Sequence, residues 1–83
     1  MKFIFYVEDT YSITGHGMMA TGRLVWSVSK PRTGDRASLL HPPGEVAQEF
    51  TIWGVEEYPV FGGIPCGIGY SEVSPVKYDF IVG

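Results

Sequence analysis

The chain has 83 residues, and its nine Asp or Glu against six Lys or Arg give a formal net charge of -3 at pH 7. Single domains run from about 50 to 250 residues, so we expect one domain over residues 1–83. Hydrophobic residues make up 45% of the chain, which excludes the composition of disordered proteins. The acidic balance argues against autonomous RNA binding, for which a basic surface is the usual signature.

Cysteine usage and hydropathy predict the compartment. Cys66 is the single cysteine, so the chain has no intramolecular disulfide and no four-cysteine zinc site, which suits a reducing cytosol. The apolar stretch at the N-terminus is too short for a signal peptide and runs directly into acids. We therefore expect a soluble cytoplasmic protein.

The first elements in chain order read as strands. β-branched and aromatic residues dominate each segment, and Gly or Pro separates the segments, as in all-β proteins. A strand over 2–8 is apolar on both sides, so we expect both of its faces to be at least partly covered: one carries Phe3, Phe5 and Val7, the other Ile4 and Tyr6. A second strand over 18–28 contains Gly22, where we expect a bulge or bend.

Turns and strands alternate through the rest of the chain. Residues 29–35 and 41–45 carry the Pro and Gly of turns and flank a short strand over 36–40. A strand over 46–55 needs a bulge at Gly54, which places Val55 beside Ile52 in the core and Trp53 outside or at a rim. The closing strands are expected over 66–70 and 76–82, which makes six or seven strands in all.

Four short sequence elements stand at fixed spacing near the N-terminus: Glu8-Asp9, Ser12-Ile13, Gly15-x-Gly17 and Thr21-Gly22-Arg23. Together they closely resemble the opening of domain 2 in elongation factor Tu and related translational GTPases. Weaker matches follow at Thr33-Gly34-Asp35, Gly54-Val55-Glu56, Gly67-Ile68-Gly69 and Gly83. The resemblance covers the chain, with departures at His16, where the family has Arg, and over 24–33, which is longer than usual and carries Trp26.

The resemblance implies a six-stranded, antiparallel, closed Greek-key β-barrel that docks on a GTPase domain, the ribosome or the aminoacyl end of tRNA. In elongation factor Tu the Glu of the Gly-Val-Glu element lies near the terminal adenosine of tRNA, and Glu56 matches it in position. The phosphate-binding loop of a GTPase is absent from this sequence, so we exclude nucleotide hydrolysis.

For each candidate catalytic residue, a structural role explains the sequence better than catalysis does. Cys66 could pair with His16 or His41, but it lies in an apolar strand where cysteine is usually a small buried hydrophobe. Adjacent strand residues point to opposite faces, so Glu8 and Asp9 do not suggest a catalytic pair. We expect no enzyme activity, no metal site and no cofactor.

Binding residues are better supported. Trp26 and Trp53 are candidate interface anchors, although either could instead belong to the core or to a lid on the barrel. If Trp26, Arg32 and Arg36 share one rim, they would form a cationic and aromatic surface for an acidic partner or RNA phosphate.

Two binding functions remain open. The first is a stand-alone, non-enzymatic adaptor that binds a protein or ribonucleoprotein partner through the barrel rim. The alternative is an inhibitor or immunity-type module unrelated to translation, which would dock through the acidic segment 45–57 and its four acids, Glu45, Glu49, Glu56 and Glu57.

Overall fold

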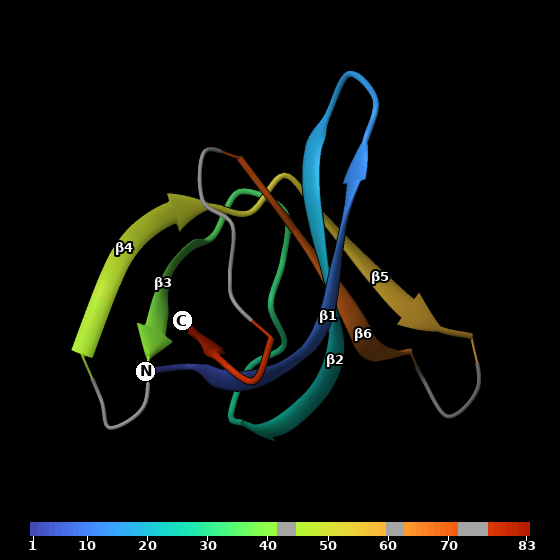
Figure 1. The fold of residues 1–83 in the computed structure, drawn as a ribbon. Coiled ribbons are helices and arrows are strands. Elements are labelled where there is room, and N and C mark those ends of the chain that lie inside the picture. Colours follow the sequence, from blue (N-terminus) through green and yellow to red (C-terminus); the bar gives the residue numbers. More distant parts are fainter. Residues whose placement is uncertain (42–44, 60–62, 72–76) are drawn as a thin grey trace.

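The computed structural model describes residues 1–41, 45–59, 63–71 and 77–83. Seven strands form one antiparallel sheet that curls into a half-barrel (Figure 1), which confirms the predicted all-β architecture. No helix in the described ranges is long and apolar enough to span a membrane. In chain order the strands are β1 (Phe3–Ile13), β2 (Gly17–Ser27), β3 (Arg36–His41), β4 (Glu45–Thr51), β5 (Gly54–Tyr58), β6 (Ile64–Tyr70) and β7 (Phe80–Val82).

The order of strands across the sheet is β4-β3-β7-β1-β2-β6-β5. The last strand, β7, therefore lies inside the sheet and pairs with β1 on one side and β3 on the other. The hairpin of β1 and β2 is the longest unit, and its tip projects beyond the rest of the sheet (Figure 1). The two ends of the chain meet where the Lys2 N–H donates to the Gly83 carbonyl.

The observed strands differ from the expected ones at several bounds. β1 continues to Ile13, because the turn after it is made by Gly15 and Gly17 in the left-handed region. β6 begins two residues early, at Ile64. β7 covers only Phe80–Val82, since Tyr78 has a φ of 77°, which no strand tolerates. The expected turn residues 42–44, residues 60–62 of the expected loop over 58–65, the expected connection over 72–75 and the first residue of the expected last strand lie outside the described residues.

The concave face of the sheet carries the core. Phe3, Phe5 and Val7 alternate inward from β1 and are fully buried, as their spacing predicts. Phe50 on β4 and Tyr70 on β6 come from opposite parts of the sheet, yet their rings lie 5.5 Å apart, so the sheet curls around this cluster. The other members of the core are Ala20, Ala37, Leu39, Ile52, Ile68 and Ile81.

A buried acid fixes the entry into β7. Asp79 is 5% exposed, and its Oδ2 lies 2.8 Å from Nδ1 of His41 at the end of β3. Backbone hydrogen bonds on either side join the same segment to β1, where the Val7 N–H donates to the Asp79 carbonyl and the Tyr78 N–H to the Val7 carbonyl, both at 2.8 Å. These contacts hold the left-handed backbone of Tyr78 in place.

The two edge strands, β4 and β5, are consecutive in the chain. The expected single strand over 46–55 is divided into β4 and β5 at Ile52 and Trp53. The backbones of these two residues bond to different parts of the sheet. The Ile52 N–H donates to the Asp35 carbonyl at 2.9 Å, on the side of β3, and the Trp53 N–H donates to the Gly69 carbonyl of β6 at 3.0 Å. As expected, Ile52 is buried in the core and Val55 packs against it.

Gly22 permits a close approach between the strands of the long hairpin. The register of β1 and β2 shifts between Val7 and Asp9, opposite Gly22, where the sequence predicts a bulge. A Cβ atom on Gly22 would lie 1.9 Å from the Tyr6 carbonyl oxygen. No side chain fits at that distance, so the hairpin depends on glycine at this position.

We predict that Gly22→Ala destabilises the protein by about 3 kcal/mol or more, because the added methyl group meets backbone that cannot move aside cheaply. Gly54→Ala is the matched control, since a Cβ there meets nothing within 4 Å. It should change the free energy of unfolding by less than about 1 kcal/mol. Urea unfolding followed by circular dichroism measures both, and equal stabilities for the two variants would contradict the close approach.

Candidate functional site

Four strands bring polar and glycine residues into one row on the convex face of the sheet. The register pairs Asp9 of β1 with Thr21 of β2, Thr21 with Gly67 of β6, and Gly67 with Glu56 of β5. Directly paired residues of antiparallel strands share a face, so these four residues form a continuous row, here called the Glu56 row. Each belongs to one of the short sequence elements described above: Glu8-Asp9, Thr21-Gly22-Arg23, Gly54-Val55-Glu56 and Gly67-Ile68-Gly69.

Tyr11 covers one side of the Glu56 row. Its hydroxyl donates to Oε1 of Glu56 at 3.3 Å, across a sequence separation of 45 residues. Desolvation raises the pKa of Tyr11 above its ordinary value, and the carboxylate of Glu56 raises it further by repelling the phenolate and accepting from the neutral hydroxyl. The Tyr11 phenol is therefore a hydrogen-bond donor at neutral pH.

Cys66 lies beside the backbone of Glu56 and is half-buried rather than fully buried. Its Sγ lies 3.5 Å from the Glu56 carbonyl oxygen, to which the thiol donates. Burial first, and then the charge of Glu56, raise the pKa of the thiol. A nucleophilic cysteine needs the opposite shift, so this environment does not activate Cys66.

Trp53 lies flat against the sheet beside the Glu56 row. A Cβ on Gly69 would meet the indole ring at 2.6 to 2.8 Å, so the absence of a side chain at Gly69 makes room for it. The indole Nε1 donates to the Tyr70 carbonyl at 2.9 Å, and the ring stacks on His16 with centroids 5.4 Å apart. Trp53 thus joins the hairpin tip to β6, outside the core as the sequence predicts.

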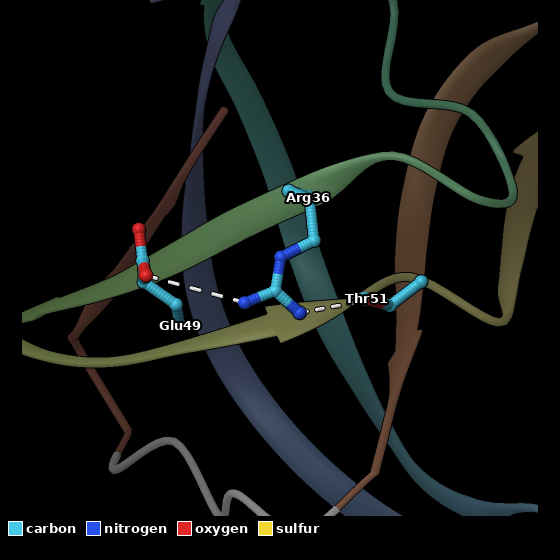
Figure 2. A network of polar contacts seen from close by, with 3 residues as sticks. All are labelled: Arg36, Glu49 and Thr51. Carbon is cyan, nitrogen blue, oxygen red and sulfur yellow. Dashed lines mark hydrogen bonds and ion pairs between the residues drawn. The ribbon is translucent and has the colours of Figure 1, made fainter.

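Trp26 and Arg36 lie elsewhere on the convex face. Trp26 is 45% exposed and pairs across the hairpin with Ile4, whereas Arg36 is three strands away on β3. Figure 2 shows the Arg36 guanidinium reaching across to β4, where it donates to the Thr51 hydroxyl at 3.0 Å and lies 4.0 Å from the Glu49 carboxylate. This exposed ion pair contributes little to stability.

Arg32 lies in the turn before β3, and its backbone N–H donates to Oδ2 of Asp35 at 3.1 Å. The five predicted binding residues therefore divide into two groups: Trp53 and Glu56 belong to the surface of β5 and β6, and Trp26, Arg32 and Arg36 lie on or next to the other half of the sheet. The acidic segment is divided too, with Glu49 on one edge strand and Glu56 and Glu57 on the other.

Sequence reasoning missed Tyr11 as a partner of Glu56, since no local pattern connects two residues so far apart in the chain. In the described ranges no three His, Cys, Asp or Glu side chains gather as a metal site would require.

No protein-family model and no curated protein matches this chain.

We predict that Glu56→Gln lowers the pKa of Tyr11, because the variant removes the negative charge that disfavours the phenolate. The pKa should remain above the ordinary value of about 10, since desolvation is the larger cause. Glu57→Gln is the control, because Glu57 does not contribute to the shift at Tyr11. A pH titration of the tyrosine ring carbons by NMR measures both variants, and an unchanged Tyr11 pKa in Glu56→Gln would contradict the contact.

Proposed function

We propose that this chain is a non-catalytic binding module of the elongation factor Tu domain 2 type, which acts in the cytoplasm, needs no cofactor and binds a protein or ribonucleoprotein partner. One observation carries the proposal. The family-like elements around Asp9, Thr21, Glu56 and Gly67 are far apart in the sequence, yet their residues align in the Glu56 row. If these residues contact one partner together, that shared contact explains why all four elements occur in one chain.

The hydrogen bonds at Ile52 and Trp53 support the closed six-stranded barrel that this proposal includes. These two residues bond to opposite ends of the sheet, so β4 and β5 are two halves of one strand whose first half pairs with β3 and whose second half pairs with β6. Counted as one, they reduce seven strands to six and join the two edges. Closure removes exposed strand edges, which suits a small stand-alone domain.

The chemistry of the Glu56 row favours binding over catalysis. Glu56 is exposed and can accept hydrogen bonds from a partner, and Tyr11 beside it presents a protonated hydroxyl. The nearby thiol of Cys66 has a raised pKa, which keeps it protonated and unreactive. A carboxylate accepts and a neutral phenol donates, so together on a glycine-lined surface they can bind the hydroxyl and amide groups of a partner.

Affinity purification of the tagged chain from its host's lysate, with and without ribonuclease, tests the proposal. We expect specific partners, and Glu56→Gln should recover them at least about fivefold less well than the wild type, since it removes a charged hydrogen-bond acceptor. Glu57→Gln should recover them normally.

Loss of the partners on ribonuclease treatment would identify a ribonucleoprotein, and resistance would identify a protein. The proposal is wrong if the wild type recovers nothing beyond what an unrelated tagged barrel recovers.

A further inference from the structure

The convex face of β2, β1, β7 and β3 is apolar where a solvated sheet face is normally polar. On β1, before the bulge at Glu8, the outward residues are Ile4 and Tyr6, whose inward neighbours form the core. An antiparallel sheet with one face in water usually alternates apolar and polar residues. Here the outward positions continue as apolar residues on β7 and at Leu40 of β3, whereas Ser38 and Arg36 of β3 are polar.

The register defines this surface, here called the outer strip. Ile4 pairs with Trp26 on one side and with Val82 on the other, and Tyr6 pairs with Phe80, which pairs in turn with Leu40. As the sequence predicts, the outward face of the first strand is partly covered, since Ile4 and Tyr6 are half-buried. Beside them, Trp26 is 45% exposed and Tyr78 is 56% exposed. Contiguous exposed apolar surface of this kind marks interaction sites.

Aromatic contacts hold one end of the outer strip in a fixed arrangement. The ring of Tyr6 lies 5.2 Å from that of Phe80 and stacks on Tyr78 at 6.1 Å. Tyr78 is the one described non-glycine residue with positive φ, and the next residue, Asp79, is buried and pairs with the partly exposed His41. A strained residue held rigidly on the surface gives a preorganised contact, because its side chain loses little freedom on binding.

Basic residues border the outer strip although the protein as a whole is acidic. Arg23 lies over the ring of Tyr6 at 5.5 Å, and Lys77 over that of Tyr78 at 5.2 Å. Alternation along their segments places Lys2 and Arg36 on the same face at the opposite end. Four of the six bases of the chain thus surround this surface, whereas Glu56 and Glu57 lie on β5, at the far edge of the sheet.

Acids near two of these bases reduce the positive charge only in part. Glu8 lies 3.7 Å from Arg23, and Glu49 lies 4.0 Å from Arg36. Both pairs are solvent-exposed, where ion pairs are weak and readily exchanged for a partner's groups.

We infer that the outer strip is the docking surface for a partner protein whose contact face is apolar and bordered by carboxylates. This inference rests on the proposed function and names the class of partner. An apolar centre with aromatic residues and arginine, surrounded by charge, is the composition of a protein–protein interface. The basic border favours a partner with acidic groups around its contact face. Opposite charges of this kind speed association and fix how the two proteins are oriented.

Two other occupants fit less well. Single-stranded RNA binds by stacking bases on free aromatic faces, but cations already lie over Tyr6 and Tyr78, and Ile4, Val82 and Leu40 offer no ring. A second copy of the chain related by a two-fold axis would bring bases against bases.

The binding test uses three fluorescent probes of equal length: a peptide of Glu and Leu, a peptide of Lys and Leu, and single-stranded oligouridylate. We expect the acidic peptide to bind, with the largest amide NMR shifts at Ile4, Tyr6, Phe80 and Val82. Lys77→Glu should weaken it about tenfold, because reversing a charge beside the contact turns attraction into repulsion. Lys30→Glu makes the same change in net charge at a lysine that instead donates to the Gly63 carbonyl, and it should bind as the wild type does.

Stronger binding of oligouridylate or of the basic peptide, shifts that map elsewhere, or equal effects of the two variants would each overturn the inference. Circular dichroism verifies that both variants fold. The same variants, used as baits in the affinity purification, separate the two proposals. Undiminished recovery of partners by Lys77→Glu would rule out the outer strip as the docking surface but leave the binding module intact. No recovery of partners by the wild type would rule out the binding module itself.

Discussion

The close approach of the two hairpin strands at Gly22, where no Cβ would fit against the Tyr6 carbonyl, marks the point at which the long hairpin divides the sheet. The strands approach so closely there that β1 accommodates the extra residue Glu8 as a bulge. Before the bulge β1 pairs with β7, and beyond it β2 pairs with β6. One hairpin therefore belongs to both halves of the sheet and lies where they meet, and the bulge lets its strand bend from one half into the other.

The curl of the sheet follows from the same division. Phe3, Phe5 and Val7 supply the inner face of one half, and Ala20, Ile68 and Tyr70 that of the other. These two sets can bury each other only if the sheet bends around them, which brings Phe50 against Tyr70 and lets Ile52 and Trp53 bond to opposite ends of the sheet. Burial of apolar area drives the bend, and the backbone hydrogen bonds fix its geometry.

Local features of the fold could be predicted from the sequence, and long-range ones could not. Alternation in β1 and the glycine at position 22 predict an inward face and a bulge because both depend on neighbours in the chain. The shortness of β7 depends on Tyr78, a residue type that does not predict positive φ, held there by partners on β1 and β3. For the candidate site, resemblance indicates Glu56, but its contact with Tyr11 depends on a register that no local pattern specifies. Apolar residues on both faces of the first strand predict that both faces are covered, but they do not tell whether the protein itself or a partner covers the outer face.

The bulge at Glu8 also separates two surfaces of opposite chemistry along one strand. On the convex side, residues before the bulge belong to the apolar and cationic outer strip, and those after it belong to the polar Glu56 row. Because β1 continues rigidly through both, a partner that bound one surface would have a fixed position relative to the other. Two contacts made on one rigid element add their free energies without a second loss of translational freedom, which is how a domain with so little surface can bind selectively.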